Sequence, residues 1–360
     1  ITLGDYTVLA ADSSDTAVEM NVCDNDGATV TLGDVKLEST NYVDLSVCDN
    51  DNATITLGDV TLEQLSTGGN TDESYWYIRE NTDSTVTLGD VTILSQAGGI
   101  DVDVEYNCDS TVTMGNVTLT AASDDAVNID VSENTDGTVT MGNVTVVTGD
   151  YTDYIDYNDR STITRLDTTV TLIGSDDSAV VTVYGNCDAD ITLGDYTVLA
   201  GDSSGTSVEF YVCDNDDATV TLGDVKLEST EYVDLYVCDN VSATVTLGDV
   251  TILSQAGGID VDVEYNCDST VTMGNVTLTA ASDDAVNIDV SENTDGTVTM
   301  GNVTVVTGDY TDYIDYNDRS TITRLDTTVT LIGSDDSAVV TVYNNTDADI
   351  TLGDYTVLAA

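Results

Sequence analysis

One short phrase recurs along the whole chain and restricts the fold more than any other feature. The segment ATVTLGDVKLEST at 28–40 returns letter for letter at 218–230, and related forms such as ITLGDVTL and TVTMGNVTV occur between them. The Leu or Met before the Gly of each phrase recurs every 21 to 31 residues. Repeats of that length are typical of solenoids, in which each repeat forms one coil against its neighbours.

The short repeats are themselves grouped into a longer repeat. It divides the chain into a first repeat unit, a second unit and the start of a further one, at 1–190, 191–349 and 350–360. Residues 85–184 and 244–343 are identical, and the second unit is shorter because it lacks the coil that carries Trp76. We expect one continuous solenoid of about 13–14 coils.

The alternation of apolar and polar residues predicts short strands rather than helices. Three successive stretches each place apolar residues on one face: Val30 and Leu32; Val35 and Leu37; Val43, Leu45 and Val47. The alternation slips at Gly33-Asp34, in the loop that follows, and at the Cys-Asp-Asn-Asp segment. An all-β chain with three strands per coil follows, and the absence of Pro agrees with continuous backbone ladders.

Three short strands in a coil of roughly 26 residues resemble the right-handed parallel β-helix of bacterial surface adhesins and polysaccharide-processing enzymes. The resemblance covers the whole chain and concerns architecture alone, and a two-sheet arch solenoid is the competing geometry. Enzymes of this architecture use Asp or Glu pairs, often with Arg, Lys or His. This chain has no His, and almost every Asp recurs in neighbouring coils. We therefore expect no enzyme activity.

The charge of the chain excludes several partners. Acidic residues number 67 against 7 Lys and Arg, for a formal net charge of −60. Such a chain repels nucleic acid and anionic membrane surfaces, and no apolar run is long enough for a membrane helix. Divalent cations or salt would screen the carboxylates, so possible partners are cations and other copies of the chain.

The Gly-Asp/Asn pairs mark one corner of the coil, because Gly allows a sharp bend. Four of these pairs are Gly33-Asp34, Gly58-Asp59, Gly115-Asn116 and Gly142-Asn143. In a parallel stack their side chains would lie about 4.8 Å apart. An Asn ladder of this kind is hydrogen-bonded, whereas an Asp ladder repels unless it is protonated or bridged by cations.

Outward-facing Thr-x-Thr pairs form a candidate surface array. Its members include Thr29, Thr31, Thr85, Thr87, Thr111, Thr113, Thr138 and Thr140, and we place Thr169 and Thr171 in the same array. Stacked coils would turn them into a flat grid, which resembles the ice-binding face of β-solenoid antifreeze proteins. The alternative is that Thr simply suits an exposed strand.

Asp-rich corners are candidate calcium sites, because clustered carboxylates suit Ca²⁺. The residues concerned are Asp24, Asp26, Asp49, Asp51, Asp214 and Asp216. Their spacing does not match the EF-hand loop, and turns favour Asp and Asn for backbone reasons. No other cofactor is expected.

We assign all seven cysteines to one corner of the coil. Cysteines of adjacent coils would lie within disulfide range if the corners are in register. The expected pairs are Cys23–Cys48, Cys187–Cys213 and Cys238–Cys267, with Cys108 left alone. The alternative is a reduced ladder of small residues. No C-x-x-C motif suggests zinc or haem.

Two further features are candidate surface sites. Sequons at Asn52, Asn240 and Asn344 are expected in exposed turns and are candidate glycan acceptors. The segment 149–165 departs from the coil pattern, and its Tyr151, Tyr154, Tyr157 and Arg160 are candidates for a lateral contact. A solvated loop is the alternative for that segment.

The chain begins and ends in ITLGDYTVLA without an evident capping sequence, and a bare solenoid end invites stacking. We expect a structural protein of the extracellular space or cell surface that forms a fibre, filament or stalk by head-to-tail continuation and is stabilised by cations. The alternative is an ice-binding or adhesin array that uses the Thr grid.

Overall fold

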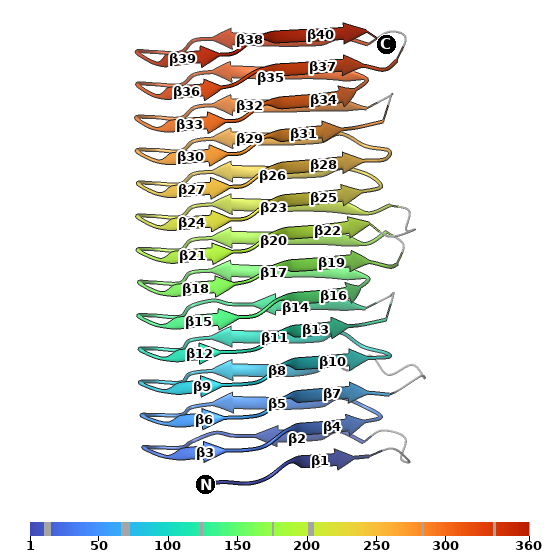
Figure 1. Ribbon diagram of the computed structural model, residues 1–360, viewed down its shortest axis with the longest axis vertical. Coiled ribbons are helices and arrows are strands. Elements are labelled where there is room, and N and C mark those ends of the chain that lie inside the picture. Colours follow the sequence, from blue (N-terminus) through green and yellow to red (C-terminus); the bar gives the residue numbers. More distant parts are fainter. Residues whose placement is uncertain are drawn as a thin grey trace. The chain divides into compact units, whose positions relative to one another are not determined.

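The computed structural model describes residues 1–10, 16–65, 73–122, 125–174, 176–200, 205–281, 284–333 and 336–359. It contains two compact units, unit 1 (Ile1–Ser175) and unit 2 (Asp176–Ala360). Within the described residues every regular element is a β-strand, and the strands of successive coils pair in parallel (Figure 1). The chain is an all-β parallel β-solenoid with three strands per coil, as the sequence predicts.

Each of the three sheets of unit 1 takes one strand from each coil. Sheet 1 contains β1 (Tyr6–Leu9), β4 (Val35–Ser39), β7 (Val60–Gln64), β10 (Val91–Ser95), β13 (Val117–Thr120), β16 (Val144–Thr148) and β19 (Thr168–Leu172). Sheet 2 contains β2 (Val18–Asn21), β5 (Val43–Cys48), β8 (Ser74–Arg79), β11 (Ile100–Glu105), β14 (Ala126–Asp130) and β17 (Asp150–Asp156). Sheet 3 contains β3 (Thr29–Thr31), β6 (Thr54–Thr56), β9 (Thr85–Thr87), β12 (Thr111–Thr113), β15 (Thr138–Met141) and β18 (Thr162–Arg165).

Unit 2 has three sheets of the same kind. Sheet 1 contains β22 (Tyr196–Ala200), β25 (Val225–Ser229), β28 (Val250–Ser254), β31 (Val276–Thr279), β34 (Val303–Thr307), β37 (Thr327–Leu331) and β40 (Tyr355–Ala359). Sheet 2 contains β20 (Ser178–Tyr184), β23 (Ser207–Cys213), β26 (Val233–Cys238), β29 (Ile259–Glu264), β32 (Ala285–Ser291), β35 (Asp309–Asp315) and β38 (Ala338–Tyr343). Sheet 3 contains β21 (Asp190–Leu193), β24 (Thr219–Leu222), β27 (Thr244–Leu247), β30 (Thr270–Met273), β33 (Thr297–Met300), β36 (Thr321–Arg324) and β39 (Asp349–Leu352).

The core of each coil consists of the inward side chains of its three strands. Val30, Val35 and Leu45, one from each strand of a coil, are all at most 6% exposed, as the alternation predicts. Trp76 on β8 is fully buried and fills its coil. Burying a Val or Leu side chain contributes about 1.5–3 kcal/mol, so the stacked apolar columns are the main source of stability.

The structure corrects two predictions about coil organisation. Segment 149–165 is no departure from the coil, because its residues form β17 and β18 in register with β14 and β15. Thr169 and Thr171 lie on β19, which pairs with β16 in sheet 1, so they do not belong to the Thr array of sheet 3. In that coil the residues in the array are Thr162 and Thr164.

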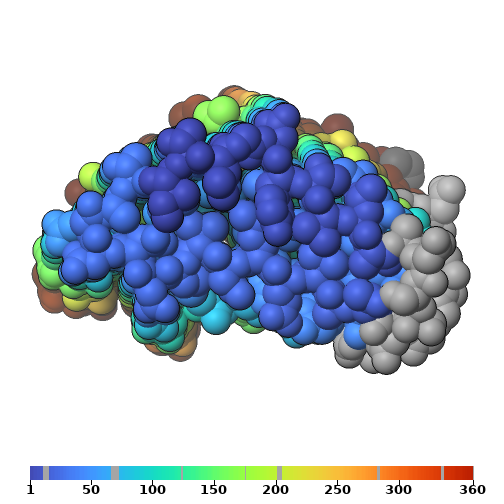
Figure 2. Space-filling model, turned by 90° about the horizontal axis from the view of Figure 1, so that it is seen from below, coloured from blue at the N-terminus to red at the C-terminus, as the bar shows by residue number. Residues whose placement is uncertain are grey.

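The two-sheet arch is excluded because each unit has three sheets. A single solenoid running through both units stays a prediction. Among the residues that the structure describes, no helix is long and apolar enough to cross a membrane. Figure 2 looks onto the N-terminal coil of unit 1, drawn in blue, where Ile1, Leu3 and Leu9 are more than half exposed.

Candidate functional site

A column of buried asparagines lines the corner between sheet 2 and sheet 3, and the sequence analysis missed it. In unit 1 its members are Asn25, Asn50, Asn81, Asn107, Asn134 and Asn158, of which all but Asn25 are at most 1% exposed. From Asn25 to Asn134, each side-chain Nδ2 donates a hydrogen bond to the Oδ1 of the Asn in the next coil, at 2.8–3.0 Å. Unit 2 repeats the column from Asn186 to Asn345.

The backbone around each asparagine turns its side chain into the coil. Tyr106 and Asp109, on either side of Asn107, have φ values of 55° and 50°. Equivalent positive φ values recur in neighbouring coils, most often at Asp, which tolerates the left-handed region. The signal in the sequence was available: an Asn stands four residues before the first residue of the T-x-T strand, as Asn107 does before Thr111.

The cysteines occupy two positions in the coil, not one. Disulfides join Cys23 to Cys48 and Cys213 to Cys238, each with a Cα–Cα distance of 4.6 Å. The expected pairs Cys187–Cys213 and Cys238–Cys267 are therefore wrong. Cys108, Cys187 and Cys267 form no disulfide.

The asparagine column explains this error. Each disulfide-bonded cysteine stands two residues before its Asn, whereas Cys108, Cys187 and Cys267 each stand directly after an Asn. The strand register consequently places Cys238 opposite Cys213 on one side and Glu264 on the other. Cys267 lies opposite Val241 instead, so it cannot reach Cys238.

The Asp-rich corners lie on the surface. Asp24, Asp26, Asp49, Asp51, Asp214 and Asp216 are all exposed. Asp26 and Asp51 are bridge partners in adjacent coils, and Asp24, Asp49 and Asp214 have positive φ. These conformations account for their presence as turn residues.

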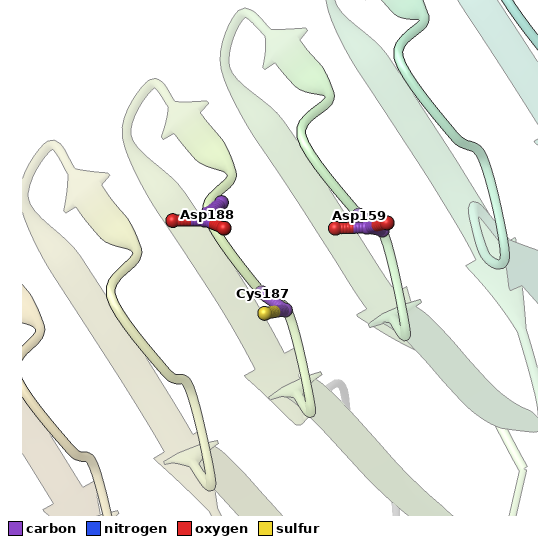
Figure 3. A group of neighbouring side chains, drawn as sticks. All are labelled: Asp159, Cys187 and Asp188. Carbon is purple, nitrogen blue, oxygen red and sulfur yellow. The ribbon is translucent and has the colours of Figure 1, made fainter.

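No compact metal site forms at these corners. Among the described residues, none of these six aspartates belongs to a group of three Cys, Asp or Glu side chains whose ligand atoms lie within 4.8 Å of one another. Figure 3 shows Asp159 in the loop before β18 of unit 1, and Cys187 and Asp188 in the loop before β21 of unit 2. Calcium binding stays a prediction.

The Gly-Asp/Asn corner is a hydrogen-bonded ladder on the surface. The N–H of Asp59 donates to Asp34 Oδ1 at 3.0 Å, and the N–H of Asn143 donates to Asn116 Oδ1 at 3.0 Å. Backbone N–H groups thus stabilise carboxylates that would otherwise only repel. The backbones of adjacent coils approach closely at the glycines of this corner, which include Gly33, Gly58, Gly115 and Gly142. A Cβ on Gly142 would lie 2.7 Å from the carbonyl oxygen of Gly115.

The threonine array is in register throughout unit 1. Thr29, Thr85, Thr111 and Thr138 lie in one column, and Thr31, Thr87, Thr113 and Thr140 lie in the other. Thr29, Thr85 and Thr111 are exposed, while the others are half-buried. Sheet 3 therefore presents a regular grid of hydroxyl and methyl groups.

Two of the predicted surface sites prove to be buried. Tyr151 is fully buried in the core and cannot make a lateral contact, whereas Tyr154 and Tyr157 are 38% and 55% exposed. The guanidinium of Arg160 bonds Asp136 through Nε at 2.8 Å. Asn240 is fully buried in the asparagine column, so it is no glycan acceptor. Asn52 and Asn344 are exposed as expected.

One buried ion pair was not anticipated. Arg165 and Asp153, both at most 1% exposed, form a two-pronged contact inside unit 1, with Nη1 of Arg165 3.0 Å from Asp153 Oδ1. Arg324 and Asp312 repeat the pair in unit 2. Arg165 has the inward parity of Ile163 and lies opposite Met141, so it occupies a core position where the neighbouring coil carries an apolar residue.

The outer face of sheet 2 in unit 1 is hollowed and acidic. A hollow of about 390 Å³ is lined by Asp101, Asp103, Glu105, Asn128, Asp130, Thr152 and Tyr154. Burial is the main cause that raises the pKa of Glu105, to about 7, and it also raises the pKa of Asp101 and of Asp130. Arg79 on β8 contacts Asp103 and lies 3.2 Å from Glu105, so one guanidinium partly offsets this charge.

These features define a three-sheet parallel β-solenoid held together by apolar columns, a column of hydrogen-bonded asparagines and disulfides between adjacent coils. Comparison with family models, with curated proteins and with solved structures finds no match.

Proposed function

We propose that the chain is a structural, non-catalytic β-solenoid of the extracellular space or cell surface that forms a fibre, filament or stalk by head-to-tail continuation. The observation that supports this proposal most is that two unusual features of unit 1 recur in unit 2. The buried pair Arg165–Asp153 returns as Arg324–Asp312, and the asparagine column returns with it. A catalytic site would break the repeat at one place, whereas a rod needs the same contacts in every coil.

A solenoid coil that no further coil covers leaves apolar side chains and strand edges exposed. Leu3 in the first coil and Val357 in the last are 53% and 45% exposed, whereas Val329, the partner of Val357 in the preceding coil, is fully buried. Backbone groups at the free edges of β1 and β40 are also available to pair. A further coil, from this chain or from a second copy, would cover both. The two disulfides favour an oxidising compartment, where such bonds persist.

Electron microscopy of the purified chain over a range of concentrations tests this proposal. We expect rods whose length increases with concentration. Val357→Asp should shorten them by placing a charge in the apolar coil-to-coil contact, whereas Thr251→Asp, at an exposed position on β28, should not. Short uniform particles at every concentration would contradict filament formation.

Cation stabilisation is a separate part of the proposal. The exposed Asp24, Asp26, Asp49 and Asp51 and the net charge support it, since Ca²⁺ would screen stacked carboxylates. Melting with and without a calcium chelator provides the test. An unchanged melting temperature would contradict a calcium role.

The in-register threonine grid favours ice binding as the second candidate. Thr113→Tyr and Thr140→Tyr would interrupt the grid, while Thr118→Tyr on the exposed face of sheet 1 is a matched control. Thermal hysteresis that is lost in the first two variants and kept in the third would support this function. No hysteresis in the unaltered protein would exclude it.

A further inference from the structure

The same stretch of sequence stands in two different electrostatic settings. Residues 85–184 and 244–343 are identical, so β11 and β14 of unit 1 have the same residues as β29 and β32 of unit 2. Only the preceding strand differs. It is β8 (SYWYIR) in unit 1 and β26 (VDLYVC) in unit 2.

This exchange removes a cation and adds a carboxylate. Arg79 lies opposite Glu105 in unit 1, whereas Cys238 lies opposite Glu264 in unit 2. Tyr75 lies opposite Asp101, but Asp234 lies opposite Asp260. The outer faces of β26, β29 and β32 therefore carry five carboxylates, and the sequence of those three strands contains no Lys or Arg: Asp234, Asp260, Asp262, Glu264 and Asp289.

Asp262 lies at the centre of this acidic face. Asp260 and Glu264 flank it on its own strand, Tyr236 lies opposite it on β26 beside Asp234, and Asp289 lies opposite it on β32. Stacked strands hold such groups about 4.8 Å apart, where like charges disfavour each other's ionisation. In unit 1 the equivalent Asp103 contacts the guanidinium of Arg79.

We propose that the outer face of β26, β29 and β32 is a proton-responsive element that weakens coil-to-coil contacts in unit 2 as the pH rises from acidic values towards neutrality, and that Arg79 opposes the same response in unit 1. Burial, followed by the charges of Glu264, Asp260, Asp289 and Asp234, raises the pKa of Asp262 to about 7. Burial and neighbouring carboxylates also raise the pKa of Asp234 to about 6.

The direction of the response follows from linkage. Between the ordinary pKa of Asp and the raised value, the folded chain binds more protons than the unfolded chain. Stability therefore decreases as the pH rises from about 4 to about 7, and the full penalty is present above the raised pKa. Replacing Asp262 with a neutral residue removes the repulsion between ionised carboxylates and should stabilise unit 2. Replacing Asp103 with a neutral residue removes the partner of Arg79 and should destabilise unit 1.

Matched substitutions at equivalent positions test the proposal in the full chain. Thermal melts at pH 5 and pH 8 compare Asp262→Asn, Asp103→Asn and Arg79→Gln with the unaltered protein. At pH 8 we expect Asp262→Asn to raise the melting temperature by at least about 3 °C and to flatten its dependence on pH. We expect Asp103→Asn to lower it, and Arg79→Gln to make unit 1 more sensitive to pH.

Hydrogen exchange assigns the effect to a unit and guards against a variant that folds poorly. Peptides covering 73–105 and 232–264 differ in sequence at their N-terminal ends, so they can be told apart although β11 and β29 are identical. After correction for intrinsic rates, exchange in β29 should increase more between pH 5 and pH 8 than exchange in β11. Equal changes in the two strands, or a stabilising Asp103→Asn, would overturn the proposal.

Discussion

Replacing Asn134 with Ala tests whether the asparagine column stabilises the solenoid. Its Nδ2 donates to Val104 O at 2.9 Å and to Asn158 Oδ1 at 3.0 Å. Its Oδ1 accepts from Nδ2 of Asn107 at 3.0 Å and from the backbone N–H of Asn107 at 3.2 Å. Alanine leaves the Val104 carbonyl and the Asn107 N–H without these partners in a site from which water is excluded.

An unsatisfied buried polar group costs about 1–3 kcal/mol, so the two backbone groups together predict a loss of about 2–6 kcal/mol. If unit 1 unfolds cooperatively, a loss near the middle of that range lowers the melting temperature by roughly 8–16 °C. Circular dichroism melts and urea unfolding measure the change.

Two companion variants make the result specific. Asn143→Ala removes an exposed corner amide whose Oδ1 accepts from the Asp167 N–H at 3.2 Å. Water can replace that bond, so we expect a loss below about 1 kcal/mol. Asn134→Asp should destabilise the chain at neutral pH and recover as the pH falls, because burial raises the folded-state pKa of a carboxyl group and protonation restores a donor. Equal losses for Asn134→Ala and Asn143→Ala would refute the role of the buried column.

Three further variants follow from the same structure. Cys48→Ser removes the disulfide to Cys23 and should cost about 2–4 kcal/mol; thiol titration of the unfolded, unreduced protein should rise from three groups to four. Asp153→Ala leaves the charge of Arg165 buried without this carboxylate and should lower the free energy of unfolding by about 3–5 kcal/mol. Replacing both residues with apolar ones should restore most of that stability, as measured by urea unfolding. Gly142→Ala forces a Cβ against backbone atoms and should cost about 1–3 kcal/mol by melting, and a loss near zero would show that the corner can relax.

Local patterning determined the architecture of this protein. A strand alternates its faces every second residue, so Val30, Val35 and Leu45 could be assigned to the core from the sequence alone. The recurring Gly-Asp/Asn pair marked a corner because only a small residue permits the close approach seen at Gly142. Every coil needs the same alternation and the same corner, so both patterns recur along the sequence and can be recognised there.

Register between coils decided the rest. A shift of one or two positions within the same corner decides which cysteine can pair with Cys238, where Cys267 lies, and whether Asn240 is buried. Alternation along a strand does not reveal that shift. Coils vary in length, so residues that share a motif need not share a place in the stack. The buried ion pair is a different case, because alternation places Arg165 inside its coil, but only the folded coil brings Asp153 of the preceding strand to it.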